Sequence, residues 1–282
     1  MNPAPAIAAA PDSLHWSDVI IIGGGCYGSF YVKQLERAAE QGRVSYSRLL
    51  VVDRYANCQA VRELAPRADR EIVVEDWGIF LDEYLGAAAE RLPSVRPSDS
   101  PLVRPSDVFP INPAAPQPRL PSQIVPSPLM PHLMYQWLVR RARERWPRRL
   151  VETRPVTSGP GTPYDVAAPD GTRYVSFADW LCPTHCTEPA LCPVIKGPRT
   201  WEMSEALQRL AARHHAEGIA AEPVLFACQH QVFGVGTFGV DDVLRGDRQV
   251  LAAGAGGAAV DLLVGTISSC HGAASRLHLG SA

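Results

Sequence analysis

The feature that most constrains the fold is a glycine-rich loop that directly follows an apolar segment. Residues Asp18–Ile22 are almost continuously apolar, which is typical of a strand buried on both faces of a sheet. A helical pattern covers Ser29–Ala39, and the residues between strand and helix read G-x-G-x-x-G: Gly23, Gly24, Gly25, Cys26, Tyr27 and Gly28. In such a loop Gly23 permits a tight turn, Gly25 lets the backbone approach a ligand, and Gly28 lets helix and strand pack closely.

Further apolar and helical patterns alternate along the chain. Strands are predicted at Leu49–Asp53, Glu71–Val74, Gln123–Val125, Val224–Cys228 and Val260–Ile267, and helices at Trp77–Leu92, from Ser127 onward, at Thr200–Gly218 and at Val240–Leu251. Strands that alternate with helices require right-handed crossovers and give a parallel sheet. We therefore predict an α/β protein with one doubly wound, Rossmann-like parallel sheet of about six strands and a small Cys-rich insertion.

Composition divides the chain into four predicted parts. A disordered, Ala/Pro-rich N-terminal segment covers 1–16; a first half of the sheet covers 17–146 and includes a loop at 93–131 that holds 12 of the 26 prolines; a hairpin and Cys-rich insertion cover 147–200; and the second half of the sheet covers 201–282. A second glycine match at 234–239 is predicted to be a turn into a helix, because the residues before it make a poor strand.

An acidic residue, Asp53, ends the second predicted strand, where its carboxylate can accept hydrogen bonds from ribose hydroxyls. With this acid and the glycine loop, residues 18–54 resemble the NAD(P)- and FAD-binding Rossmann superfamily. The resemblance implies that a dinucleotide binds along Gly23–Gly28, with its ribose at Asp53 and Arg54. Because a 2′-phosphate would meet Asp53 as a like charge, NAD is favoured over NADP; Arg54 softens that preference, and the triple glycine leaves FAD open.

Three cysteines are concentrated within 11 residues. They are Cys182, Cys186 and Cys192, spaced C-x3-C-x5-C, with His185 between them. Thiolates select zinc or an iron–sulfur cluster, and a structural zinc site needs a fourth ligand. Cys270 is the predicted fourth ligand, because it follows the last apolar strand at the edge over which the insertion would fold; the alternatives are His271, Cys228 and His230. The alternative to a metal site is a set of free or buried thiols in a proline-stiffened loop.

Overall charge and hydropathy exclude several classes of protein. With 27 basic and 29 acidic residues the net charge is −2, which argues against a nucleic-acid binder. No apolar stretch is long enough for a membrane span. Seven cysteines without an export signal favour the reducing cytoplasm.

Three functions are consistent with these patterns. The first is an NAD(P)-dependent oxidoreductase with a Cys-ligated metal centre near the cofactor edge. The second is a non-enzymatic NAD-sensing subunit, because the opening β-α-β segment also resembles the nucleotide-binding domains that regulate potassium transport; a Cys-rich insertion departs from that pattern. The third is a metal-stabilised scaffold protein. A small-molecule dinucleotide is the predicted partner, and a protein partner or homo-oligomer is left open.

Overall fold

The computed structural model describes residues 13–90, 120–183, 186–219 and 222–282. Of the predicted disordered segment 1–16, residues 1–12 lie outside the described residues. Its last residues are ordered, because the first strand begins at Leu14 and Trp16 is 3% exposed. Most of the proline-rich loop and His185 lie outside the described residues. Within the described part, no helix is long and apolar enough to cross a membrane.

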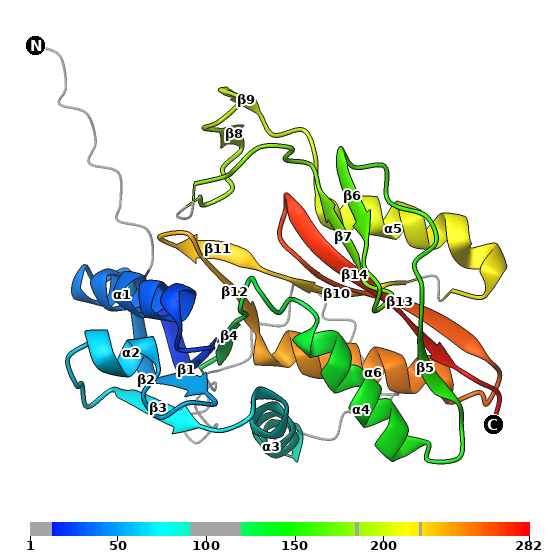
Figure 1. The fold of residues 1–282 in the computed structure, drawn as a ribbon, viewed down its shortest axis with the longest axis horizontal. Coiled ribbons are helices and arrows are strands. Elements are labelled where there is room, and N and C mark those ends of the chain that lie inside the picture. The colour runs from blue at the N-terminus through cyan, green and yellow to red at the C-terminus, as the bar shows by residue number, and fades with distance from the viewer. Residues whose placement is uncertain (1–12, 91–119, 184–185, 220–221) are drawn as a thin grey trace, which may run out of the picture.

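The chain is α/β, as predicted, but the described strands form mixed sheets rather than one parallel sheet (Figure 1). In the first sheet the order is β11 (Gln229–Val232), β12 (Val235–Gly239), β4 (Gln123–Val125), β1 (Leu14–Ile22), β2 (Val44–Asp53) and β3 (Arg70–Val74). The four strands from β4 to β3 are parallel, whereas β12 pairs antiparallel with β4 and β11 antiparallel with β12.

A second sheet holds the rest of the large strands. Its order is β10 (Val224–Ala227), β13 (Val260–Ile267), β14 (His271–Leu279), β7 (Arg173–Ser176) and β6 (Tyr164–Ala167), with β5 (Val151–Arg154) paired to the far end of β14. Only β10 and β13 are parallel. The single parallel sheet was a wrong prediction because β14, whose sequence lacks a continuous apolar run, forms a hairpin with β13 and makes the pairing antiparallel. A short β8–β9 ribbon (Leu191–Cys192 and Gly197–Pro198) lies apart from both sheets.

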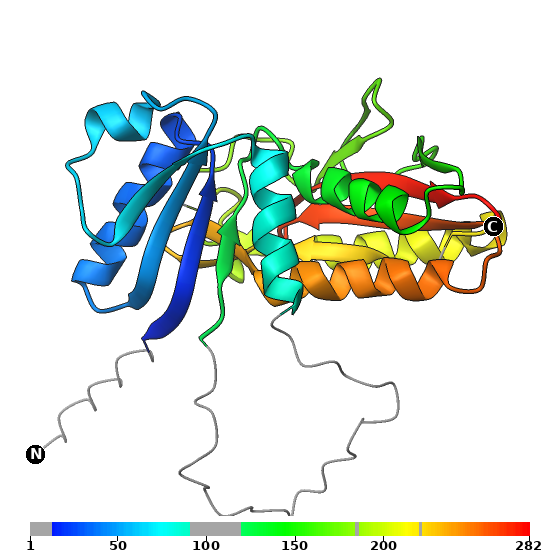
Figure 2. The same cartoon turned by 90° about the horizontal axis from the view of Figure 1, so that it is seen from below.

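Helices cover both sheets (Figures 1 and 2). Side chains from both sheets pack together in one core. The helices are α1 (Cys26–Glu40), α2 (Gln59–Glu63), α3 (Trp77–Glu90), α4 (Leu133–Arg145), α5 (Met203–Arg213) and α6 (Val240–Gly254), with a 3₁₀ turn at His214–Glu217. Alternate residues of β1 show the arrangement: Ile21 packs toward α1, whereas Ile20 packs into the core that α3, α4 and α6 share with the second sheet. Helix α5 covers the opposite face of the second sheet.

Several predicted boundaries need correction. The helix predicted to start at Ser127 begins at Leu133, and the one predicted from Thr200 begins at Met203. The residues judged a poor strand before the second glycine match form β11, and part of that match is strand β12 rather than a turn. Both are short strands of a hairpin at the edge of a sheet, where a long apolar run is not required.

Candidate functional site

The glycine loop leaves β1 and enters α1 in the geometry that its sequence predicts. Gly23 has φ of +90°, which favours glycine, and its N–H donates to Val52 O at the end of the neighbouring strand (2.8 Å). A Cβ on Gly28 would lie 1.8 Å from Gly23 O, so only glycine permits this close approach of helix and loop. Gly25 differs: it has an ordinary negative φ of −76°, and a Cβ there would have no neighbour within 4 Å. The backbone at Gly25 therefore faces open space at the start of α1.

The acid at the end of β2 is tied to the loop. The buried Asp53 carboxylate accepts a hydrogen bond from Gly24 N through Oδ2 (2.7 Å) and one from Tyr55 N through Oδ1 (2.9 Å). Arg54 turns away from it, pairs with Asp76 (2.6 Å) and lies over the Trp77 ring (4.3 Å to the centroid). Each Asp53 oxygen keeps a further lone pair, so the carboxylate can still accept a ribose hydroxyl. Of the other predicted loop residues, Cys26 and Tyr27 are exposed.

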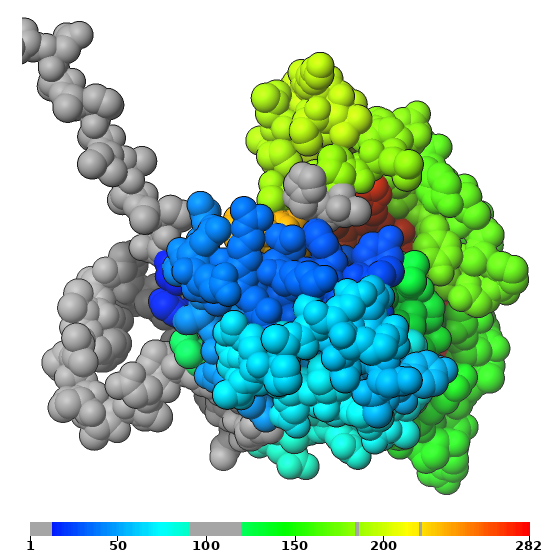
Figure 3. Space-filling model, turned by 60° about the vertical axis from the view of Figure 1, so that its left-hand side comes forward, coloured from blue at the N-terminus to red at the C-terminus, as the bar shows by residue number. Residues whose placement is uncertain are grey.

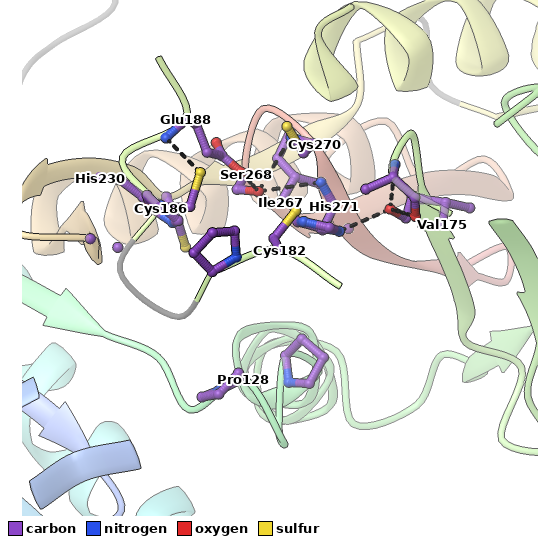
Figure 4. A pocket seen from close by; sticks show the side chains of 18 of the residues that line it. Pro128, Val175, Cys182, Cys186, Glu188, His230, Ile267, Ser268, Cys270 and His271 are labelled. Carbon is purple, nitrogen blue, oxygen red and sulfur yellow. Dashed lines mark hydrogen bonds between the residues drawn. The ribbon is translucent and has the colours of Figure 1, made fainter. Parts of the chain in front are cut away.

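A cavity of about 480 Å³ lies where the carboxyl ends of β4, β10 and β13 meet the Cys-rich segment. Its lining includes the Pro126–Pro128 segment after β4, Tyr31 on the second turn of α1, and a polar group of Glu188, Arg199, His230 and His271. Five of the seven cysteines also line it: Cys182, Cys186, Cys192, Cys228 and Cys270. In Figure 4 the labelled Cys, His and Glu side chains gather along one wall, with Pro128 opposite. The glycines of the loop and Asp53 are not part of this lining.

Glu188 fastens the Cys-rich segment to the turn between β13 and β14. Its Oε1 accepts a hydrogen bond from Ser268 Oγ (2.6 Å) and its Oε2 one from Ser269 N (2.7 Å). Burial acts to raise the pKa of Glu188, but the Ser268 hydroxyl, the nearby His230 and the Ser269 N–H outweigh it and lower the pKa. The glutamate is therefore held ionised. Glu188 was not predicted from the sequence. The signal that could have indicated it is an acidic residue inside a cysteine-rich loop, because a buried carboxylate there requires hydrogen-bond partners.

Each of the two histidines in the wall is held through its own Nδ1. His230 Nδ1 donates to Cys186 O (2.7 Å), which ties β11 to the Cys-rich segment. The Ser176 hydroxyl donates to Ala178 O, so it accepts from His271 Nδ1 (2.9 Å). Burial lowers the pKa of His271, with Glu188 opposing and His230 adding to the shift. A neutral His271 leaves its Nε2 as an acceptor.

Burial shifts three cysteines of the wall toward the neutral thiol. Burial raises the pKa of Cys270 to about 12 and that of Cys228 to about 12. Burial also raises the pKa of Cys182, and the neighbouring Cys186 and Cys192 add to the shift. Fold and sequence thus bring the three cysteines of the insertion and the predicted fourth ligand to one cavity. Among the residues that the structure describes, no three Cys, His, Asp or Glu side chains are grouped closely enough to hold a metal ion.

In Figure 3 the yellow-green segment that carries β8 and β9 rises above the blue surface of α1. Fold and site together define a class of protein. It is an α/β protein with a glycine-rich loop after the first strand and a cavity lined by cysteines. A family model described as "Uncharacterized protein, C-terminal domain" (AF_1314_C) matches residues 134–280, just over half of the 282 residues. The chain belongs to this family. Neither the curated proteins nor the solved structures contain a match.

Proposed function

We propose that the protein binds a dinucleotide, NAD in preference to NADP or FAD, on the Gly23–Gly28 loop and acts as an NAD(P)-dependent oxidoreductase. The order of the parallel strands supports this proposal. Strands β3, β2, β1 and β4 are parallel and adjacent in the order found in a Rossmann-like sheet. In such sheets ligands bind beyond the carboxyl ends of the strands, where the chain crosses to the other side. Here that point lies between β1 and β4.

One observation carries the proposal: the glycine loop and the cavity lie on either side of this point. The loop follows β1, whereas Pro126, Ser127 and Pro128 follow β4 and line the cavity. Tyr31 links the two, because it lies in α1 and also lines the cavity; burial raises its pKa to about 12, with Tyr27, Cys228 and Cys26 adding to the shift. A dinucleotide with its pyrophosphate at the start of α1 therefore has the cavity within reach of its redox ring.

The chain's own residues have separable tasks in this proposal. The open backbone at Gly25 and the free N–H groups of the first turn of α1 bind the pyrophosphate. Asp53 orients the ribose. The cavity, whose lining combines apolar residues with the polar side chains of Glu188, Arg199, His230 and His271, excludes water and holds the substrate. When bound, the nicotinamide supplies hydride transfer.

Substitution of Gly25 by Val tests the binding step. Because a Cβ at Gly25 meets no protein atom, we expect the variant to fold normally and to lose dinucleotide binding, measured by calorimetry with NAD(H), NADP(H) and FAD. The matched control is Gly256→Val, which also places a side chain in open space but far along the chain. Absence of binding to the unmodified protein at millimolar nucleotide would reject the proposal.

Turnover separates the enzyme from the sensor. We expect the unmodified protein to oxidise NADH with an artificial electron acceptor, and Gly25→Val to lose this activity. Nucleotide binding without turnover would instead support the NAD-sensing alternative. A protein that contains metal but shows neither dinucleotide binding nor turnover would support the scaffold alternative.

A further inference from the structure

A serine, a histidine and a glutamate are joined by hydrogen bonds outside the cavity described above. The Ser158 hydroxyl donates to His214 Nε2, and His214 Nδ1 donates to Glu217 Oε2 (2.8 Å). Ser158 is exposed, whereas His214 is only 6% exposed. In Figure 1 the end of α5, which directly precedes His214, lies on the opposite side of the molecule from α1. A nucleophile, a base and an orienting acid are connected in this same order in serine hydrolases.

Local backbone geometry places the histidine next to the glutamate. After α5 the chain makes one 3₁₀ turn at His214–Glu217, which Gly218 ends with φ of +80°. Residues three apart lie one above the other in a 3₁₀ turn, so the side chains of His214 and Glu217 meet. Arg276 of β14 also pairs with this acid, with Nη1 3.6 Å from Glu217 Oε2. The carboxylate therefore fixes the histidine proton on Nδ1 and leaves Nε2 as the acceptor.

The loop between β5 and β6 is fastened on both sides of Ser158. Arg173 Nη1 donates to Val156 O (3.0 Å) before the serine, and Arg213 Nη2 donates to Gly159 O (3.1 Å) after it. In the part of the chain that the structure describes, Arg213 pairs with no carboxylate. Its guanidinium charge is therefore available to an anionic oxygen that forms beside Ser158.

Two other Ser–His pairs among the described residues lack part of this arrangement. Ser176 donates its hydroxyl proton to Ala178 O, so it cannot donate it to His271. The exposed Ser45 is bonded to His15 Nδ1 (2.7 Å), but no described acid is bonded to the other ring nitrogen of His15. The Ser45–His15 pair is therefore a matched control for the effect of the acid.

We propose that Ser158, His214 and Glu217 form a second active site, which hydrolyses carboxylic esters. Ser158 Oγ bonds to the acyl carbon while its proton moves to His214 Nε2, and the Arg213 charge stabilises the oxyanion. His214 then gives this proton to the alcohol oxygen as the ester C–O bond breaks. Water attacks the acyl-serine, passes a proton through His214 to Ser158, and leaves as part of the carboxylic acid. Glu217 stays ionised and acts as a positioning residue for His214.

Covalent labelling with a fluorophosphonate tests the nucleophile on the full chain. The Ser158 oxygen displaces fluoride from phosphorus, so we expect a label that peptide mass spectrometry assigns to Ser158. Ser158→Ala should remain unlabelled. Ser45→Ala should be labelled like the wild type, because Ser45 belongs to the pair without an acid. An unlabelled wild type, or a label that persists in Ser158→Ala, would overturn the proposal.

Hydrolysis of p-nitrophenyl acetate measures turnover. Because Ser158 is exposed, Ser158→Ala should keep the wild-type circular dichroism spectrum and Tm, and should lower kcat by about 10²-fold or more. Equal kcat in the wild type and in this variant would overturn the proposal.

Glu217 is tested through the balance between kcat and KM. Glu217→Gln keeps an acceptor for the Nδ1 proton of His214 but removes the charge, so kcat should fall while KM stays the same. Glu217→Asp, which restores the charge, should recover part of the loss. A raised KM with unchanged kcat in Glu217→Gln would overturn the assigned role of Glu217.

The two proposed activities can be separated. Gly25→Val should lose dinucleotide binding and retain ester hydrolysis, whereas Ser158→Ala should do the reverse. Ester hydrolysis in a protein that binds no dinucleotide would reject the proposed function and leave this inference standing. Loss of ester hydrolysis in Gly25→Val would assign the reaction to the glycine loop and overturn this inference.

Discussion

Gly28 shows how a single hydrogen atom in place of a side chain decides the local structure. A Cβ there would lie 1.8 Å from Gly23 O, which is backbone and cannot swing aside. We expect Gly28→Ala to lower the free energy of unfolding by about 2 kcal/mol or more, because helix α1 must move off the loop. Chemical denaturation measures the change.

The control substitution at Gly86 should have the opposite sign. Gly86 lies in α3, and a Cβ there would meet nothing within 4 Å. Gly86→Ala should therefore stabilise the protein by about 0.5–1 kcal/mol, since alanine loses less backbone entropy in a helix. Equal effects at Gly28 and Gly86 would contradict the explanation from close packing.

Local patterns predicted the residues that depend on near neighbours, and missed those that depend on distant ones. The roles of Gly23 and Gly28 follow from the loop itself and are confirmed by φ of +90° and by the close approach. Glu188 is different: its partners, Ser268 and Ser269, lie some 80 residues further along the chain. No local period or spacing reports such a contact.

At the scale of single elements, Asp76 starts helix α3. Its Oδ1 accepts hydrogen bonds from Gly78 N (2.8 Å) and Ile79 N (3.4 Å). Burial acts to raise the pKa of Asp76, but these two N–H groups and Arg54 outweigh it and lower the pKa. The carboxylate is thus more stable in the folded protein than in the unfolded chain.

We expect Asp76→Ala to cost about 0.5–1 kcal/mol at neutral pH, a figure kept small because the side chain is 40% exposed. A lowered folded pKa contributes stability above the ordinary pKa of an aspartate and loses it as the pH falls through the folded value. The difference between wild type and variant should therefore shrink below about pH 4. Asp76→Asn retains an acceptor and should show a smaller loss; a pH-independent difference for Asp76→Ala would contradict the explanation.

Elements with a continuous apolar run were predictable, and exposed or mixed elements were not. The strands at Gln123–Val125 and Val260–Ile267 have the predicted bounds. Strand β14 was missed because its sequence, HGAASRLHL, alternates weakly and contains charge. Its buried polar residues are satisfied by partners in other strands: His278 Nδ1 bonds Asp261 (2.5 Å) on β13. The α/β class was predicted correctly without β14, but the prediction of a single parallel sheet was wrong.

At the scale of the whole molecule, the two sheets share one core. Helices α3, α4 and α6 bury side chains of both, and Phe226 of β10 meets Phe238 of β12 with ring centroids 6.0 Å apart. If one sheet unfolded, the core-facing side chains of the other sheet would be exposed to solvent. We therefore expect one cooperative unfolding transition, with coincident curves from tryptophan fluorescence and far-UV circular dichroism.

Phe238→Ala removes a fully buried ring from the seam between the sheets and should cost about 3–5 kcal/mol. The transition should move to lower denaturant and remain single. Tyr164→Ala, which truncates an exposed ring on β6, is the control and should change stability little. Two separated transitions, in the wild type or the variant, would show that the sheets unfold independently.

The position of β14 in the chain also affects how the protein is made. This strand pairs with β13, β7 and β5, so it completes the second sheet only after every other strand of that sheet has left the ribosome. Translation adds about 5–20 residues per second, so the earlier strands wait for several seconds without their central partner. During that delay Cys182, Cys186 and Cys192 have neither Cys270 nor the Glu188 anchor at Ser268. The cavity that these cysteines line is therefore incomplete in newly made chains until this last strand docks.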